Sequence, residues 1–298
     1  MIKLSSKFDQ SNDVTLYLGD CFDLIKTIPD NSVKLIVTSP PYAMGKDYER
    51  PKDNIATFIS QHIRLLPELI RVLQPGGSLC WQVGYHIKNG IYTPLDFLIY
   101  DIVQNMNKTQ LDDDKLYLQN RIIWTFGHGL MPKKRFSGRH ETILWFTKGM
   151  DYELDQDALR EPQKYPGKKN KNGEYTGNPL GQALSDVWDI PNVKANHIEK
   201  TEHPCQFPVA IPQRLIKMLT KPGEIVLDPF NGSGATGIAA MIEGRKYVGA
   251  DIMEKYIEIS KESIIKASKG EAKYREDKPV YQPTGKNAVE RKPEHFKW

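Results

Sequence analysis

Hydrophobic residues in the first part of the chain alternate between the patterns of buried strands and of helices. Residues 33–37, Val-Lys-Leu-Ile-Val, have too little polar alternation for a strand with one face in water, which indicates a sheet covered on both faces. Strands are predicted at 14–19, 33–37 and 78–83, and helices at 22–27 and 55–73, the last ended by Pro75-Gly76-Gly77. Successive strand–helix–strand units of this kind predict an α/β fold.

The alternation continues later in the chain and is interrupted once. We expect a helix at 94–106, strands at 121–124 and 141–146, a helix at 208–219, a strand at 224–227, a helix at 234–243, a strand at 247–250 and a helix at 254–266. Residues 150–196 break the pattern with prolines, glycines, lysines and tyrosines, which predicts a loop-rich insertion. After Lys269 the chain is polar and charged, so we expect a tail that lies on the surface or moves freely.

The composition fits one large core with a small appended lobe, because 39% of the 298 residues are hydrophobic and 26% are charged. No apolar run reaches the roughly 18 residues that a membrane span requires, and the first residues lack the apolar core of a signal peptide. We therefore expect a cytoplasmic protein with no membrane partner. Three distant cysteines, and seven histidines without paired ligand spacing, predict neither a disulfide framework nor a metal site.

The net charge of +4 is too small to identify a partner, but the distribution of positive charge is more informative. Basic residues gather in two segments that glycine and proline punctuate. The first segment holds Lys133, Lys134, Arg135 and Arg139, and the second holds Lys164, Lys168, Lys169 and Lys171. Each segment alone fits either a solvated loop or a contact with nucleic acid phosphates.

A glycine-rich turn lies between the predicted strand at 224–227 and the helix that follows. Gly232, Gly234 and Gly237 fit a GxGxxG pattern, which on its own also describes a dinucleotide site. Asp228, at the tip of the strand, would repel a pyrophosphate and attract a ligand with an ammonium and a sulfonium. Asp251 ends the next strand, a position from which a carboxylate can bind ribose hydroxyls. Asp251 suits either cofactor, whereas Asp228 favours S-adenosylmethionine over NAD.

Thr38-Ser39-Pro40-Pro41-Tyr42 follows the buried strand at 33–37, at the edge where open α/β sheets bind ligands. Methyl transfer to an exocyclic base amine is difficult because the nitrogen lone pair is delocalised into the ring. Acceptors that hold the amine protons out of the ring plane free this lone pair, and Ser39 Oγ and the Pro40 carbonyl are such acceptors. Tyr42 can stack on a base rotated out of the duplex, although a rigid Pro-Pro exit from a strand also fits these residues.

These motifs, in this order, resemble those of the DNA methyltransferases that form N4-methylcytosine or N6-methyladenine, of the circularly permuted β class. In that class a [Ser/Asp/Asn]-Pro-Pro-[Tyr/Phe] motif comes first, a target-recognition region second and the cofactor glycine loop last. The resemblance extends to about Lys266. It implies a doubly wound, mostly parallel seven-stranded sheet of the class I S-adenosylmethionine-dependent methyltransferase type, circularly permuted, with an inserted loop-rich lobe.

The resemblance implies a role for each part of the chain. Residues 1–149 would form the catalytic half of the domain, 150–196 a target-recognition insertion, 197–268 the cofactor-binding half and 269–298 a polar C-terminal tail. The implied catalytic residues are Ser39, Pro40, Pro41 and Tyr42, and the implied cofactor-binding residues are Asp20, His203, Pro204, Phe207, Asp228, Phe230, Asn231, Gly232, Ser233, Gly234 and Asp251. We then expect the two basic segments to bind double-stranded DNA, and a restriction endonuclease acting on the same site is a further candidate partner.

Several functions remain open from the sequence. Thr-Ser-Pro-Pro-Tyr is associated in this family more often with N4 of cytosine, and Asp-Pro-Pro-Tyr more often with N6 of adenine, so we favour cytosine and keep adenine as the alternative. An RNA or small-molecule methyltransferase is more remote, because a small substrate would not need the basic insertion. Pro204-Cys205-Gln206 is similar to the nucleophile motif of C5-cytosine methyltransferases, but Cys205 precedes a predicted helix instead of following a strand. A silent DNA-binding subunit would not need a complete site.

Overall fold

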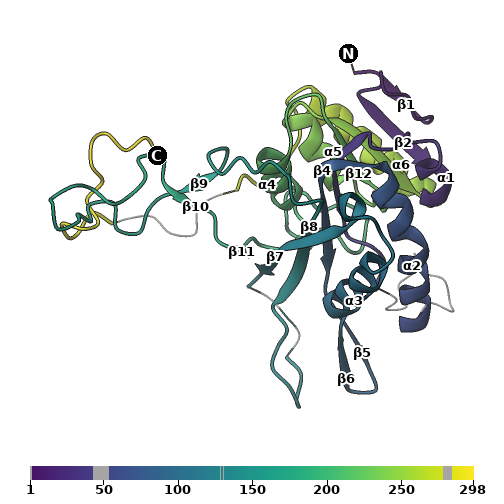
Figure 1. Ribbon diagram of the computed structural model, residues 1–298, viewed down its shortest axis with the longest axis horizontal. Coiled ribbons are helices and arrows are strands. Elements are labelled where there is room, and N and C mark those ends of the chain that lie inside the picture. The colour runs from purple at the N-terminus through teal and green to yellow at the C-terminus, as the bar shows by residue number, and fades with distance from the viewer. Residues whose placement is uncertain (1, 43–53, 128, 130, 278–283) are drawn as a thin grey trace.

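The computed structural model describes residues 2–42, 54–127, 129, 131–277 and 284–298, arranged around a large mixed sheet (Figure 1). The strands run in the order β1 (Leu4–Ser5), β2 (Val14–Leu18), β13 (Lys246–Asp251), β12 (Ile225–Asp228), β3 (Val33–Thr38), β4 (Leu73–Val83), β8 (His140–Lys148), β7 (Leu116–Thr125) and β11 (Val187–Asp189). β8 is antiparallel to both of its neighbours, and the other neighbouring pairs are parallel. The short edge strands β1 and β11 extend the sheet beyond the seven strands expected from the sequence.

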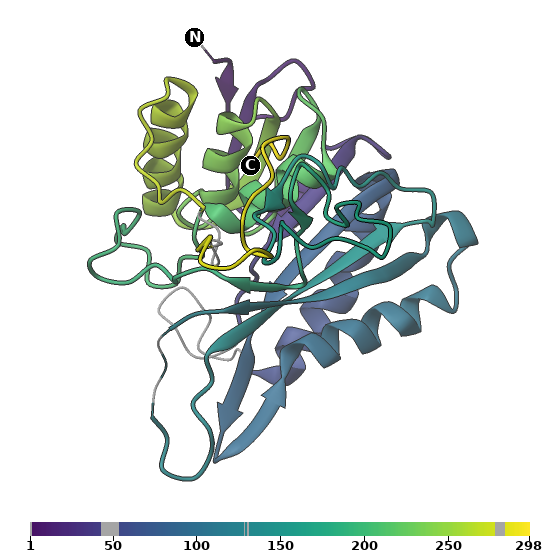
Figure 2. The same ribbon diagram turned by 90° about the vertical axis from the view of Figure 1, so that its left-hand side faces the viewer.

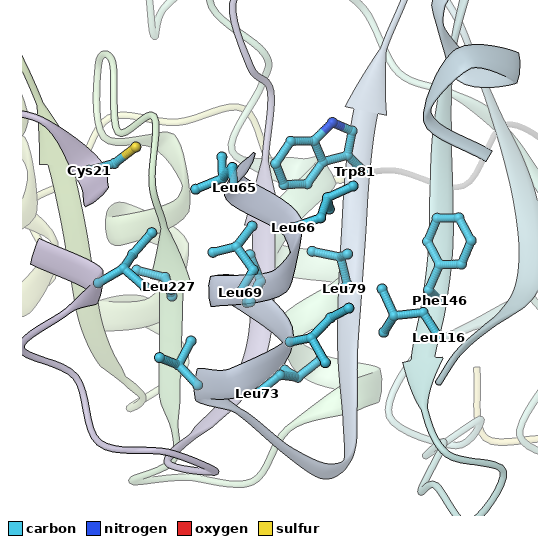
Figure 3. Close-up of a cluster of buried hydrophobic side chains, with 14 of the residues drawn as sticks. Cys21, Leu65, Leu66, Leu69, Leu73, Leu79, Trp81, Leu116, Phe146 and Leu227 are labelled. Carbon is cyan, nitrogen blue, oxygen red and sulfur yellow. The ribbon is translucent and has the colours of Figure 1, made fainter. Parts of the chain in front are cut away.

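Helices cover both faces of this sheet. One face carries α1 (Cys21–Ile25), α2 (Ile55–Val72) and α3 (Leu95–Asn107), and the other carries α4 (Ala210–Leu219), α5 (Ala235–Ile242) and α6 (Glu254–Ser268). A single 3₁₀ turn, η1 (Asp112–Asp114), precedes β7. Each helical layer packs on its own hydrophobic cluster, and Figure 3 shows leucines of α2 pointing toward Leu79 and Trp81 of β4. This is the doubly wound α/β arrangement that the sequence predicts.

The central strand β3 explains why its sequence lacks polar alternation. All six of its residues are buried. Ile36 packs in the cluster beneath α2, whereas Leu35 and Val37 pack in the cluster beneath α4 and α5. A parallel strand between two helical layers buries both of its faces, so apolar residues occupy successive positions.

The pairing of β2 with β13 places an early strand of the chain beside its last strand. Val14 lies opposite Tyr247, and Leu18 lies opposite Asp251. On the other side of β13, β12 pairs in parallel with both β13 and β3. Because parallel strands end at the same edge of a sheet, the residues that follow β3 and those that follow β12 meet there.

Some elements depart from those expected. β7 extends over Leu116–Thr125, well beyond the apolar run at 121–124, because much of it is only half buried and carries polar residues. β8, at His140–Lys148, lies close to the expected run at 141–146. The hairpin formed by β5 (Tyr85–Lys88) and β6 (Ile91–Pro94) was not expected, and its partly exposed side chains leave no hydrophobic pattern to find.

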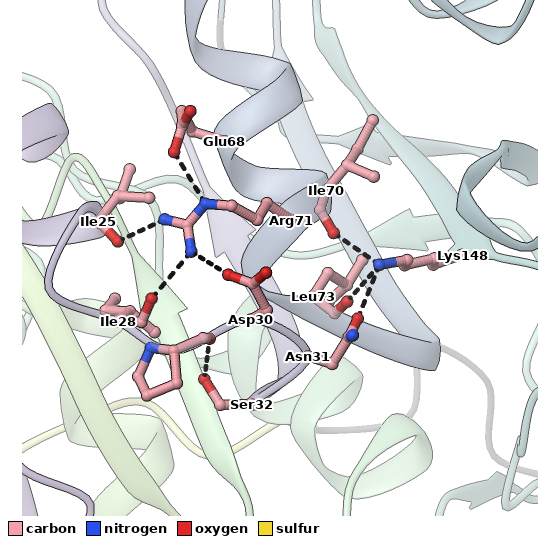
Figure 4. A network of polar contacts seen from close by, with 11 residues as sticks. Ile25, Ile28, Asp30, Asn31, Ser32, Glu68, Ile70, Arg71, Leu73 and Lys148 are labelled. Atoms are coloured by element: carbon pink, nitrogen blue, oxygen red, sulfur yellow. Dashed lines mark hydrogen bonds and ion pairs between the residues drawn. The ribbon is translucent and has the colours of Figure 1, made fainter. Parts of the chain in front are cut away.

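A polar network lies at the edge of the sheet where the parallel strands begin, opposite the edge where β3 and β12 end (Figure 4). The Arg71 guanidinium, in the last turn of α2, donates to the backbone carbonyls of Ile25, which ends α1, and Ile28, and to Asp30. The Lys148 ammonium, on β8, donates to two carbonyls at the end of α2 and to Asn31. The network joins α1, α2 and β8 away from the edge where the residues after β3 and β12 meet.

Residues 150–196 form an insertion with little regular structure, as the sequence predicts. Its strands β9 (Arg160–Glu161) and β10 (Gln182–Ala183) pair antiparallel and enclose a lobe, and β11 joins the main sheet. In both ribbon views residues 284–298, drawn in yellow, lie against this lobe (Figures 1 and 2). Within the described ranges, no helix has the length and apolar character needed to cross a membrane.

Candidate active site

A buried carboxylate joins the two sequence motifs. The Thr38 hydroxyl, at the end of β3, donates to Asp228 Oδ1 at 2.6 Å. The Thr236 hydroxyl, on α5, donates to Asp228 Oδ2 at 2.8 Å, and the Phe230 N–H donates to Oδ1 at 3.1 Å. Ser39 to Tyr42 and the glycine turn are therefore held at one edge of the sheet, although they are far apart in sequence.

Asp228 is buried, and its carboxylate contacts the protein itself. Only 1% of the residue is exposed, and burial raises the pKa of its carboxyl to about 6, although the three hydrogen bonds act in the opposite direction. The sequence suggested a carboxylate that faces a cationic ligand. In the structure its oxygens contact Thr38 and Thr236, so the carboxylate orients both loops and its direct contact with a ligand stays a prediction.

The glycine turn needs glycine for two physical reasons. Gly232 and Gly234 have φ of 50° and 83°, in the left-handed region that side chains disfavour. A Cβ at Gly234 would lie 2.6 Å from Ser260 Cβ, so the glycine also allows α6 to pack closely. The turn is fixed further by the Gly232 N–H, which donates to Asp251 Oδ2 at 2.9 Å.

Three aspartates end three adjacent strands at this edge. Asp251 ends β13, its Oδ1 accepts the Met253 N–H at 2.9 Å, and burial raises its pKa. Asp20 follows β2, is exposed, and caps α1 by accepting the Phe22 N–H at 3.0 Å. With Asp228 at the end of β12, this set of acids fits a ligand that carries positive charge and hydroxyl groups.

The other expected cofactor residues divide into two groups. His203 lies over the turn, with Nε2 3.2 Å from the position of a Cβ at Gly232, and burial lowers the pKa of its imidazole to about 4. Phe230 borders the site with its ring 6.4 Å from that of Trp81, while Pro204 is exposed. The remaining three are turned inward: Phe207 packs against the core, Ser233 is 7% exposed, and the buried Asn231 amide accepts the Tyr247 hydroxyl at 2.8 Å.

A half-buried glutamate that sequence reasoning missed contacts the Ser-Pro-Pro-Tyr motif. Glu141, in β8, accepts the Tyr42 hydroxyl on Oε2 at 3.2 Å, and the Gln82 amide donates to the same oxygen. The Tyr42 oxygen also lies 3.3 Å from Ser39 Oγ. Burial raises the pKa of Glu141, and burial together with the Glu141 charge raises the pKa of Tyr42 well above its ordinary range. An acid opening the apolar run 141–146 was the available signal.

The two basic segments remain apart. Lys133, Lys134, Arg135 and Arg139 are exposed in the connection between β7 and β8, and Lys164, Lys168, Lys169 and Lys171 are exposed in the lobe between β9 and β10. Figure 1 shows the two segments projecting in different directions, the lobe to the left and the β7–β8 connection downward. The same β7–β8 connection carries Phe136, which is 98% exposed. This connection leads directly into Glu141, which contacts Tyr42.

The fold and the order of its motifs define a permuted class I methyltransferase, in which the Ser-Pro-Pro-Tyr motif precedes the glycine turn. A family model described as DNA methylase, covering the N6 and N4 methyltransferases, matches residues 33–262. The chain belongs to this family. It is an S-adenosylmethionine-dependent DNA amino-methyltransferase, and the glycine turn with its three aspartates fits that cofactor. In the parts of the chain that the structure describes, no cluster of three or more potential metal ligands occurs.

Individual proteins show the same relationship. The chain is 39% identical over 262 residues to the Type II methyltransferase M.BglII of Bacillus subtilis, and the match covers 86% of this chain and 70% of that protein. It is 32% identical over 257 residues to the DNA adenine methyltransferase YhdJ of Escherichia coli (strain K12), covering 82% and 80%.

Solved structures share the fold. The putative DNA modification methylase TTHA0409 from Thermus thermophilus, complexed with S-adenosylmethionine, has a TM-score of 0.61 and 25% identity, and the match covers 86% of this chain and 96% of that one. The cytosine-N4-specific PvuII DNA methyltransferase has a TM-score of 0.65 at 20% identity, covering 89% and 93%. The second likeness concerns the fold alone.

Proposed function

We propose that the protein methylates N4 of a cytosine within a specific DNA sequence, after the base has rotated out of the duplex. The observation that carries this proposal is the placement of Ser39 and Tyr42 at the end of β3, tied to the glycine turn through Thr38 and Asp228. The choice of cytosine is supported by Ser39, a neutral acceptor in the form of the motif more often associated with that base. N6 of adenine is the second candidate, supported by the activity in the name of the relative YhdJ.

The residues at this edge would act as follows. When bound, the cofactor supplies an electrophilic methyl group. Ser39 Oγ and the Pro40 carbonyl accept hydrogen bonds from the amine and hold its protons out of the ring plane, which frees the nitrogen lone pair. The partly exposed Tyr42 ring stacks on the base. Asp251 and His203 would hold the cofactor beside the turn, and Asp20 would contact its adenine part.

We assign DNA contact to both basic segments. The lysines of the lobe and the cations of the β7–β8 connection would bind phosphates on either side of the target base, and other side chains of the insertion would read base edges. Because several relatives are named Type II methyltransferases, a restriction endonuclease with the same recognition sequence is the expected functional partner. Such a pair would act in the cytoplasm of a bacterial cell.

The test is to incubate the protein with DNA of mixed sequence and labelled S-adenosylmethionine, digest the DNA and identify the labelled nucleoside. Label in N4-methylcytosine is the expected result. Label in N6-methyladenine would replace cytosine by adenine, and no label across diverse DNAs would refute the proposal. Tyr42→Ala is the matched control: it should lower methyl transfer much more than cofactor affinity, because its ring contacts the base and not the cofactor.

A further inference from the structure

Residues 284–298, here called the tail segment, are built into the lobe formed by residues 160–183. The Gly167 N–H donates to the Val289 carbonyl at 2.9 Å, and the Lys297 N–H donates to the Pro179 carbonyl at 2.7 Å. A Cβ at Gly167 would lie 2.3 Å from the Ala288 carbonyl oxygen, which shows how closely the two backbones approach. These contacts join the two segments at both ends.

Aromatic side chains from both segments share one small core. Phe296 is only 3% exposed, and its ring lies 6.3 Å from Tyr175 of the lobe and 6.2 Å from Trp298. Tyr175 also packs against His295 at 5.3 Å. The lobe has little regular structure of its own, so burial of Phe296 supplies apolar packing that residues 160–183 lack.

Positive charge is concentrated in this joint unit. The lobe and the tail segment together contain nine Lys and Arg residues against four Asp and Glu, whereas the rest of the chain contains 32 against 33. The tail segment contributes four of these cations, and all four are exposed: Lys286, Arg291, Lys292 and Lys297. The excess charge of the protein therefore lies in these two segments.

We propose that the tail segment is the second half of the DNA-binding lobe, and that its four exposed cations bind backbone phosphates together with the lysines of the insertion. This inference rests on the proposed function, because it takes DNA as the polyanion. A duplex fits such a surface better than a small anion, since the cations are spread over two segments and do not converge on one point.

The test compares three variants in which four exposed cations become glutamine. The tail variant changes Lys286, Arg291, Lys292 and Lys297; the lobe variant changes Lys164, Lys168, Lys169 and Lys171; the control changes Lys7, Lys26, Lys108 and Lys266, which lie on other parts of the surface. DNA affinity is measured across a salt titration. The slope of log K against log salt is negative, and removal of one cation that pairs with a phosphate should reduce its magnitude by about 0.9. The slope of the tail variant should therefore be smaller in magnitude by up to about 3.6. The control should keep the wild-type slope.

The outcomes separate this inference from the proposed function. A wild-type slope for the tail variant, with a reduced slope for the lobe variant, would overturn the inference and leave the proposed function intact. Wild-type slopes for both would remove the whole lobe from the interface and overturn the inference as well. Absence of methyl transfer to any DNA is a separate result that concerns the proposed function only.

Phe296→Ser provides a test that leaves the charges unchanged. Loss of the buried ring should release the tail segment, so limited proteolysis should cleave within 284–298 faster while S-adenosylmethionine affinity stays the same. DNA affinity should fall toward that of the tail variant. Faster cleavage with unchanged DNA affinity would contradict the inference.

A different observation, the contacts of Glu141, carries a second inference. The Gln82 amide nitrogen can only donate, so Glu141 Oε2 is an acceptor and the single Tyr42 hydroxyl proton points toward it. The Tyr42 oxygen can then only accept from Ser39, 3.3 Å away. With its proton directed at Tyr42, Ser39 Oγ keeps its lone pairs for another donor.

We infer that Glu141 is a positioning residue that sets the direction of this hydrogen-bond chain and so keeps Ser39 Oγ as an acceptor for the substrate amine. This inference rests on the assignment of Ser39 to the amine. When the Gln82 amide turns to present its carbonyl oxygen, glutamine at 141 can place its nitrogen at this position and direct an N–H toward the Tyr42 oxygen. This reversal would send the tyrosine proton to Ser39 and the serine proton toward the substrate. A donor would then face the amine, where an acceptor is required.

The test measures kcat and the DNA dissociation constant for Glu141→Gln, alone and with Tyr42→Phe. Glu141→Gln should lower kcat on the order of tenfold or more, as removal of an oriented polar contact does, with little change in DNA affinity. Adding Tyr42→Phe should restore part of kcat, because the misdirected proton is gone. Wild-type kcat for Glu141→Gln, or a further loss in the double variant, would overturn the inference, while a merely structural role would give no such rescue.

Discussion

Replacing Asp228 by asparagine should change how the stability of the protein depends on pH. The wild-type carboxyl is buried and its pKa is raised from 3.8 to about 6, with burial as the largest cause. Between these two values the folded state keeps the proton and the unfolded state loses it, so the folded wild type loses stability as the pH rises. Asparagine cannot ionise, and its amide can still pair with the hydroxyls of Thr38 and Thr236.

The size of the effect follows from the pKa difference. Two pKa units correspond to about 3 kcal/mol, at about 1.4 kcal/mol for each unit. The free energy of unfolding of the wild type, minus that of Asp228→Asn, should therefore fall by about 3 kcal/mol between about pH 4 and about pH 7. Subtracting the variant removes the contribution of the other carboxylates, which titrate in both proteins.

Urea unfolding at several pH values measures this difference. A difference that does not change with pH would show that the carboxyl is not desolvated, and one that grows with pH would show that its hydrogen bonds outweigh its burial. The same variant tests the ligand role suggested by the sequence. S-adenosylmethionine affinity at neutral pH should drop markedly if Asp228 contacts the cofactor, and only slightly if it orients the two loops.

Three further outcomes follow from the structure. Lys148→Met should lower the free energy of unfolding by about 3 kcal/mol in urea titrations, because two buried backbone carbonyls would lose a charged donor; a loss below about 1 kcal/mol would contradict this. Gly234→Ala should lower both thermal stability and cofactor affinity, because φ of 83° and the contact with Ser260 oppose a side chain; unchanged melting would argue against the turn as described. His203 should not make S-adenosylmethionine affinity depend on pH between about pH 6 and about pH 8, because its pKa of about 4 keeps the imidazole neutral there. Substitution of His203 should leave the shape of the curve of affinity against pH unchanged.

The sequence predicted those parts of the fold that rest on local pattern. The buried strand β3, the amphipathic helix α2 and the glycine turn each leave a local mark, and each was found close to its expected position. The hairpin of β5 and β6 was missed because half-exposed side chains carry no such mark. Residues 43–53, which follow the Ser-Pro-Pro-Tyr motif, lie outside the described residues.

The sequence predicted site residues that belong to one continuous motif, and it did not predict contacts between residues that are far apart in the chain. Ser39 to Tyr42 and Asp228 were recognisable from their own motifs, but no local pattern reports that Asp228 is enclosed by Thr38 and Thr236. Glu141 was missed for the same reason, because it reaches Tyr42 through the pairing of β8 with β4. The packing of the tail segment on the lobe was not predicted, because its sequence is mostly charged and polar and its contact depends on one buried aromatic residue, Phe296.

The pairing of β2 with β13 has a consequence for how the protein is made. During synthesis β2 emerges early, directly after its neighbour β1, but its other neighbour, β13, emerges only after the insertion and β12 have been translated. Until then the edge of β2 offers unpaired backbone groups to other chains. The part of the sheet formed by β12 and β13 closes late, so a nascent chain should depend on chaperones for longer than a chain whose neighbouring strands follow one another in sequence.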